Sequence, residues 1–164
     1  MRFLIKQAAR YPWSVAKAYY SGVSFDPTGQ DAAPHGHTFK TDGIKMYISG
    51  VATDKIYQYS LSTAWDLSTA TYDSVSFSLA QDSTPWGIII KDDGMRMFIA
   101  GIDNTSVYEY AIGTAWDIST ASYVGSRVIV SSQDSQPAGL TFKSDGARLY
   151  VTGGTNDKIY QYTC

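Results

Sequence analysis

The chain has 164 residues, of which 44% are hydrophobic and 17% charged, and its formal net charge is −2. This length suits one domain, and the absence of clustered Lys and Arg excludes the basic patch that nucleic-acid binding requires. No apolar run approaches the roughly 20 residues of a membrane span, so none is expected. The 13 tyrosines and 14 glycines, with so little charge, are typical of a β-rich protein.

The first twelve residues do not follow the pattern of the rest. Their apolar run, 3–5, is three residues long, whereas a signal peptide needs roughly 7–15, so no signal peptide is expected and the location stays open. Residues 4–7 align with Ile56–Tyr59, which favours a strand, and a short amphipathic helix or docking arm is the alternative. We therefore expect residues 1–12 to form an arm of uncertain structure.

Residues 13–164 repeat one pattern three times. A Pro-x-Gly motif begins at residues 34, 85 and 137, so the steps are 51 and 52 positions. Trp13, Trp65 and Trp116 keep a similar step. Self-similarity at this period is typical of propellers, solenoids and other repeat folds, and it gives the repeated tryptophans a structural role.

Each repeat is predicted to contain four strands. The first runs from Pro-x-Gly to an Asp-Gly turn, where Gly43, Gly94 or Gly146 favours a tight hairpin. The second and third strands follow, and then a Thr-Ala-Trp-Asp loop with its tryptophan folded inward. The predicted second strands are 45–49, 96–100 and 148–152, the third strands 56–59, 107–110 and 159–162, and the fourth strands 72–79 and 123–131. Residues 20–25 share the Val-Ser-Phe sequence of a fourth strand and are predicted to form one.

Four hairpin-linked strands in about 51 residues predict an all-β fold of antiparallel propeller blades. A β-solenoid is the rival fold, but Asp-Gly hairpins disfavour its parallel coils. The motif from Pro34 to Ile48, followed by a polar turn and Ile-Tyr-x-Tyr, resembles β-propeller repeats of the NHL and YncE-like type. The phrase Ser-Thr-Ala-Trp-Asp-Leu-Ser-Thr-Ala-Thr-Tyr is similar to repeats of uncharacterised propellers of marine bacteria and phage, which accompany tail or fibre proteins. The resemblance implies a propeller over residues 13–164.

The order of the strands indicates how a ring would close. The chain opens on an outer strand at 20–25 and finishes on a third strand, so the last blade lacks its outer strand. Three blades are too few for a ring, because propellers have about 4–8. We expect a homodimer of six blades closed by reciprocal strand exchange. The alternative is that the chain is a fragment of a longer propeller. Cys164, the single cysteine, excludes an intrachain disulfide, and an intermolecular crosslink is a less favoured use of it.

Candidate sites are sought where the repeats differ. Tyr47, Phe98 and Tyr150 repeat and are predicted to pack between blades. His35, Trp86 and His37 stand at variable positions near the mouth of the central channel, and a strand would place both histidines on one face. We expect a channel lining rather than a metal site, which would need more ligands. Glutamine–aspartate pairs precede each inner strand, and they are predicted either to cap loops or, as the alternative, to attract calcium at the channel mouth: Gln30, Asp31, Gln81, Asp82, Gln133 and Asp134.

No nucleophile motif, phosphate loop or paired catalytic group is found. The sequence therefore predicts a non-enzymatic structural or binding module without a cofactor. Its partner would be a glycan or another protein of a phage virion or cell surface. The alternative is a channel-site enzyme of the lactonase or glycoside-acting propeller type.

Overall fold

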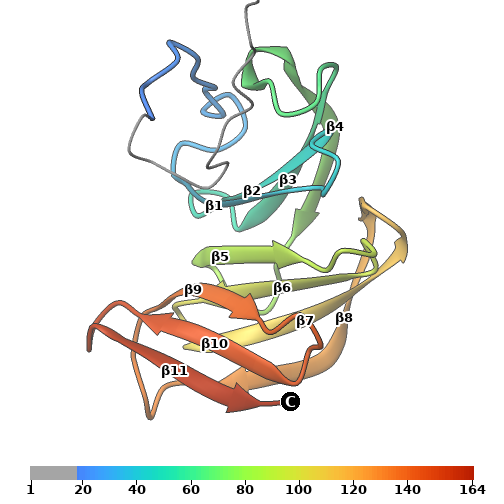
Figure 1. Ribbon diagram of the computed structural model, residues 1–164. Coiled ribbons are helices and arrows are strands. Elements are labelled where there is room, and N and C mark those ends of the chain that lie inside the picture. Colours follow the sequence, from blue (N-terminus) through green and yellow to red (C-terminus); the bar gives the residue numbers. More distant parts are fainter. Residues whose placement is uncertain (1–17) are drawn as a thin grey trace, which may run out of the picture.

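The computed structural model describes residues 18–164, which form three antiparallel β-sheets and one short 3-10 helix. Figure 1 shows the sheets side by side, with the first sheet at one end of the row and the third at the other. The innermost strand of each sheet lies beside that of the next, β1 beside β5 and β5 beside β9. The predicted all-β class and the four-stranded antiparallel blade are confirmed, as a partial propeller.

The strands follow each other in space in the order of the sequence, as successive hairpins require. The first sheet contains β1 (Pro34–Phe39), β2 (Lys45–Gly50), β3 (Lys55–Leu61) and β4 (Ala70–Ser78), with the 3-10 helix η1 (Leu67–Thr69) before β4. The second contains β5 (Pro85–Ile90), β6 (Arg96–Gly101), β7 (Ser106–Thr114) and β8 (Asp117–Ile129). The third contains β9 (Pro137–Phe142), β10 (Arg148–Gly153) and β11 (Lys158–Thr163).

Most predicted strands agree with these bounds to within two residues. The exceptions are β7, which ends four residues after the predicted 110, and β8, which begins six residues before the predicted 123, because Thr114 and Asp117 already pair across a tight turn. Residues 18–26 include the predicted outer strand at 20–25 but pair with no strand in the described part of the chain.

The Asp-Gly turns are coupled to the tryptophan loops. Gly43 and Gly94 have φ of +76° and +72°, which a residue without Cβ adopts at little cost. Trp65 and Trp116 each donate a backbone hydrogen bond to the carbonyl of one of these glycines, 3.0 Å away in both sheets. Each indole ring lies so close over its glycine that a Cβ there would come within 2.5 Å of ring atoms. The glycine thus serves both the turn and the tryptophan.

The two tryptophans differ in exposure, and the prediction that both fold inward is wrong for one of them. Trp116 is half-buried and lies against Tyr47 of the preceding sheet, with ring centroids 6.4 Å apart. Trp65 is 60% exposed, since no described sheet precedes its own. Burial of this loop therefore depends on the neighbouring blade.

Each sheet buries one face against the next sheet. Alternate side chains of a strand point to opposite faces, so Tyr47 and Ile56 face the second sheet while Met46 and Ile48 belong to a different cluster. Between the first two sheets the core also contains Ile88, Ile90, Met97 and Ile99. A smaller core of Ala100, Val107, Leu149 and Val151 joins the second sheet to the third. As predicted, Tyr47 and Phe98 pack between blades, Tyr47 against Trp116 and Phe98 against Phe142.

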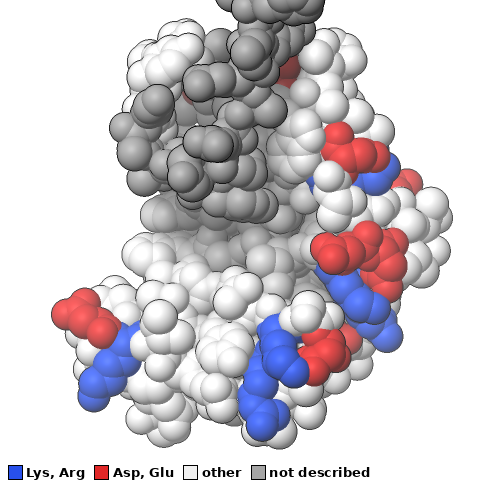
Figure 2. Space-filling model, viewed as in Figure 1, with Lys and Arg blue, Asp and Glu red and all other residues white. Residues whose placement is uncertain are grey.

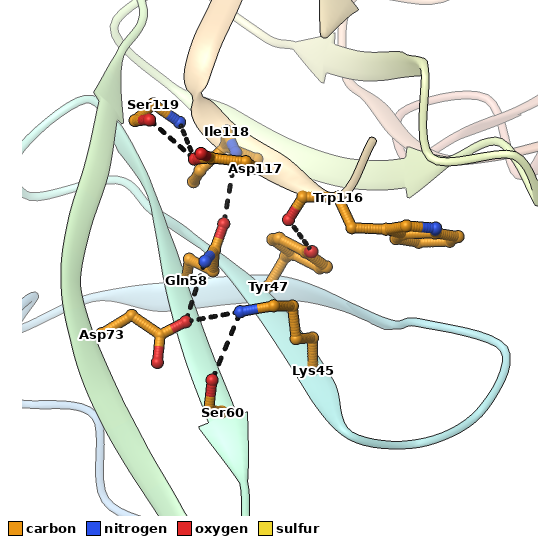
Figure 3. Close-up of polar contacts among 9 residues, drawn as sticks. All are labelled: Lys45, Tyr47, Gln58, Ser60, Asp73, Trp116, Asp117, Ile118 and Ser119. Atoms are coloured by element: carbon orange, nitrogen blue, oxygen red, sulfur yellow. Dashed lines mark hydrogen bonds and ion pairs between the residues drawn. The ribbon is translucent and has the colours of Figure 1, made fainter. Parts of the chain in front are cut away.

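A polar clasp strengthens the first of these junctions (Figure 3). Tyr47 donates its hydroxyl hydrogen to the carbonyl of Trp116 at 2.6 Å, and the side-chain oxygen of Gln58 accepts the backbone N–H of Ile118 at 3.2 Å. The amide nitrogen of Gln58 donates to Asp73 at 2.8 Å, and Lys45 donates to the same carboxylate at 2.9 Å. The first sheet therefore holds the loop of the second at two backbone groups.

Charged side chains play a minor part in this packing. Figure 2 shows acidic and basic residues next to each other in small mixed groups on one face of the molecule. Lys91 pairs with Asp93 at 2.7 Å and Arg96 with Glu109 at 3.2 Å, and all four side chains are substantially exposed. Exposed pairs of this kind contribute about 0–1 kcal/mol each. The sheets are therefore held together mainly by apolar burial.

Replacement of Gly94 by alanine tests the coupling between turn and tryptophan. Gly125→Ala is the matched control, because Gly125 also has positive φ (+83°) but has no atom within 4 Å of a built Cβ. The control is expected to cost about 1–2 kcal/mol from backbone strain, and Gly94→Ala about 1–3 kcal/mol more, since the indole must move. Urea unfolding measures both, and equal losses would contradict the coupling.

Removal of the Tyr47 hydroxyl tests the clasp. Tyr47→Phe leaves the carbonyl of Trp116 without its donor and is expected to lower the free energy of unfolding by about 1–3 kcal/mol. Tyr123→Phe is the control, because the Tyr123 hydroxyl has no hydrogen bond among the described residues. A Tyr47→Phe variant as stable as this control would contradict a stabilising role for the hydrogen bond from Tyr47 to Trp116.

Candidate functional site

The three innermost strands converge because glycines let their backbones approach. A Cβ on Gly36 would meet the Trp86 carbonyl oxygen at 2.1 Å, and one on Gly87 would meet the Ala138 carbonyl oxygen at 2.6 Å. The Ser49 hydroxyl bridges this contact, accepting from the Gly36 amide at 2.8 Å and donating to the Trp86 carbonyl at 3.1 Å. The glycine of Pro-x-Gly is therefore required by the neighbouring blade.

An open cavity of about 420 Å³ lies over these strands and is lined by β1, β5 and β9. Its side chains include His35, His37, Thr38, Trp86, Ile89 and Leu140. The structure thus brings together the two histidines and the tryptophan that the sequence singles out at the channel mouth. Among the described lining residues there is no Lys, Arg, Asp or Glu.

The two histidines have different neighbours. A β-bulge between Pro34 and His37 sets two residues of β1 opposite one of β2. His35 stacks on Trp86, with ring centroids 4.9 Å apart and 12° between the planes, whereas His37 meets Phe39 edge-on at 6.1 Å. Both imidazoles are exposed. The i, i+2 spacing suggests one strand face, but the bulge turns the rings toward different partners.

The glutamine–aspartate pairs lie outside the cavity lining. Asp31, Asp82 and Asp134 are 2–4% exposed, and each accepts backbone N–H groups of its own turn and of the turn after the second strand. Gln30, Gln81 and Gln133 accept hydrogen bonds from the second tyrosine of each Tyr-x-Tyr motif, at 3.3, 3.0 and 3.3 Å. Sequence reasoning missed this pairing, although both motifs repeat with the same step.

The hydrogen bonds that Asp31 accepts offset the effect of burial on the pKa of its carboxyl. Burial by itself would raise the pKa of the Asp31 carboxyl, but the Thr53 hydroxyl and the amides of Ala33 and Ala52 outweigh it and leave the pKa below its ordinary value. Burial raises the pKa of the neighbouring Tyr59 to about 12, so this tyrosine stays a neutral donor at physiological pH. The Asp31 carboxylate and the Tyr59 hydroxyl are thus both hydrogen-bonded, as expected of groups with a structural role.

Acid unfolding tests the role of Asp31. A carboxyl with a lowered folded-state pKa contributes stability above its unfolded pKa of about 3.9, and that contribution is lost as the pH falls through the folded value. Asp31→Asn is therefore expected to lower the melting temperature at pH 7, with the difference from wild type shrinking toward pH 3. The control is Asp92→Asn, an exposed carboxyl without a side-chain hydrogen bond or ion pair among the described residues; a difference for Asp31→Asn that does not change with pH would refute the assignment.

No group of three or more potential metal-ligating residues occurs among residues 18–164. The calcium alternative for the aspartates stays a prediction, and their carboxylates already accept hydrogen bonds from the protein. No helix in the described residues is long and apolar enough to cross a membrane. Trp13 and the arm 1–12 lie outside the described residues. Gly146 lies in its predicted turn with φ +77°, and Tyr150 lies in β10.

Solved β-propellers are similar to this fold. No protein-family model and no curated protein matches the sequence. A candidate 6-phosphogluconolactonase from Bacteroides fragilis superposes with a TM-score of 0.60 at 13% identity, over 79% of this chain and 34% of that one. The periplasmic gluconolactonase of Pseudomonas aeruginosa gives 0.59 at 15% identity, over 79% and 35%. The Cps50 (Swd1) β-propeller domain of Myceliophteria thermophila gives 0.53 at 10% identity, over 78% and 39%.

At these identities the likeness shows the fold, and the chain spans well under half of each similar structure. The comparisons also correct the predicted function. Two of the three structures are named for a lactonase activity. The predictions of a non-enzymatic structural or binding module, and of a chain that is not an enzyme, are therefore wrong, and the lactonase alternative has the better support. The sequence contains no local catalytic motif, but this does not exclude an active site, because residues of different repeats can meet in the folded structure.

Proposed function

We propose that the chain contributes the channel-mouth site of a lactone-hydrolysing β-propeller. The observation that carries the proposal is the convergence of His35, His37 and Trp86, from two different sheets, on one cavity of about 420 Å³. Such a volume suits a small ligand, and an exposed imidazole is the commonest general base of enzymes. The lactonases among the similar structures support this choice of reaction.

The proposed reaction uses one imidazole and one water molecule. The imidazole takes a proton from the water as the water oxygen attacks the lactone carbonyl carbon. The tetrahedral intermediate then expels the ring oxygen, and the imidazolium returns the proton to that oxygen. The product is a single ring-opened hydroxy acid, and water is the only other reactant. Trp86 offers an aromatic face on which the apolar side of a sugar ring packs.

The lining residues favour a neutral sugar lactone as substrate. Phosphate groups are bound in proteins by Arg and Lys, and the described lining has neither. A glycoside-acting enzyme usually needs two carboxyl groups on either side of the bond, and the described lining has none. An unphosphorylated lactone such as glucono-δ-lactone is therefore proposed over a phosphorylated lactone or a glycoside.

A turnover assay with glucono-δ-lactone tests the proposal, measured above the spontaneous rate. His35→Ala and His37→Ala are prepared separately, and loss of the base is expected to lower kcat by about 10²–10⁴-fold in one of them. Trp86→Ala is expected mainly to raise KM. Asp145→Asn, on an exposed hairpin far from the cavity, is the control and should retain full activity. Wild-type protein without turnover of any lactone, phosphorylated or not, would refute the proposal.

The origin of the repeats is a separate proposal. The phrase at residues 62–72, whose Thr-Ala-Trp-Asp recurs at residues 114–117, resembles repeats of propellers from marine bacteria and phage. Tail or fibre genes beside this gene would support a phage source, and a neighbourhood of sugar-metabolism genes would favour a cellular enzyme.

A further inference from the structure

The third sheet presents an uncovered edge at β11. In the first two sheets the first apolar residue of the third strand lies opposite a residue of the fourth strand and is buried against the next sheet, so Ile56 is 0% and Val107 4% exposed. The same position in β11 is Ile159, which is 72% exposed. On the opposite face of the third sheet from Ile159, an apolar groove of about 360 Å³ lies between the second and third sheets, lined by Phe98, Tyr108, Phe142, Leu149 and Tyr162 among others. One strand would complete this sheet.

Residues 18–26 have the contacts of a fourth strand but no sheet to belong to. Phe77, near the end of β4, packs edge-on against Tyr110 of the next sheet, with centroids 5.3 Å apart and 77° between planes. Phe25 packs against Tyr59 in the same way, at 5.1 Å and 78°. Phe25 thus occupies the place of Phe77 in a blade preceding the first sheet. The residues before it stay exposed, Tyr20 at 73% and Val23 at 38%.

These two features lie at opposite ends of the row of sheets (Figure 1), so one molecule does not join them. We propose that residues 18–26 of one copy form the fourth strand on β11 of a second copy, and reciprocally. Two copies then close a ring of six blades with two-fold symmetry, within the usual range for propellers. The proposal is independent of the lactonase function, and it would place a second His35 and His37 around the same channel.

The repeat fixes the register of this pairing. Lys55 lies opposite Ser78, and Ile56 opposite Phe77. Two repeats on, Ile159 would lie opposite Phe25 of the second copy, which buries both, and Lys158 would lie opposite Asp26, an opposite-charge pair. Cross-strand pairs of these kinds contribute roughly 0.2–1 kcal/mol each.

The aromatic contacts extend the same pattern. Tyr72 lies against Tyr57 and Tyr59, at 6.0 and 5.6 Å between centroids. Tyr123 lies against Tyr108 and Tyr110 at 6.2 and 5.6 Å. In the proposed dimer, Tyr20 fills the equivalent place against Tyr160 and Tyr162 of the second copy.

The clasp residues of the first junction recur at β10 and β11. Tyr150 and Gln161 in the third sheet are the copies of Tyr47 and Gln58 in the first. The side chain of neither has a hydrogen-bond partner within residues 18–164, although their backbones pair with each other. The exposed Trp65 loop is the copy of the Trp116 loop that the first clasp holds. In the dimer, Tyr150 and Gln161 of one copy would face the Trp65 loop of the other copy, across the junction between the two chains.

Measurement of mass in solution tests the proposal with the full chain. Wild type is expected at twice the 18.0 kDa of one chain, or about 36 kDa, by analytical ultracentrifugation at micromolar concentration. Ile159→Asp should shift the mass to that of one chain, since it places a charge on the covered position. The control is Val124→Asp, another exposed apolar strand residue (39%), which should stay dimeric. A monomeric wild type, a larger assembly, or an Ile159→Asp protein that stays dimeric would overturn the proposal.

A disulfide crosslink tests the register without relying on a destabilising change. Asp26→Cys and Lys158→Cys are combined in a Cys164→Ser background, because Cys164 is free and exposed. Oxidation should yield a covalent dimer on a non-reducing gel. Asp26→Cys combined with Asp145→Cys, on a distant hairpin, should not. Lack of a crosslink for the first pair, or equal crosslinking of both, would refute the strand exchange. None of these readouts depends on lactone turnover, so the two proposals fail separately.

Discussion

The structure depends on the need of each β-sheet to bury a face against another sheet. A propeller blade cannot bury its apolar faces by itself, and here the next repeat covers one of them. Glycines in the Pro-x-Gly motifs bring the inner strands close, and tyrosines and isoleucines fill the space between sheets. The hydrogen bonds of Tyr47 and Gln58 then fix the loop of the following sheet. Stability is therefore shared between neighbours.

For the same reason, residues at the ends of the row of sheets are more exposed than their copies in the middle. An interior position such as Ile56 is fully buried, whereas its copy at the end, Ile159, is 72% exposed. Trp116 is held by a preceding sheet, but Trp65 is not. Residues that are buried in the middle of the row are thus exposed at its ends, and the proposed strand exchange starts from that difference.

The candidate site uses the positions at which the repeats differ. The inner strands repeat nearly the same backbone geometry. Gly36 and Gly87 allow the close approach of neighbouring strands, and the residue before each glycine can therefore vary. His35 and Trp86 occupy that position and stack on each other. The cavity that they line contains imidazole and indole side chains, whereas the buried Asp31, Asp82 and Asp134 lie outside its lining and accept hydrogen bonds from turn amides.

The sequence by itself determined the period, the hairpins and the order of strands, because Asp-Gly turns and alternating apolar residues act locally. It also identified the channel-mouth positions at which the repeats differ, because such differences are visible in the sequence itself. Only the tertiary structure decided that a bulge separates His35 from His37, that the aspartates are buried caps, and that Trp65 is exposed. Those outcomes depend on which sheet lies next to which. The predicted non-enzymatic function was wrong for a related reason, because a site assembled from separate blades leaves no local motif in the chain.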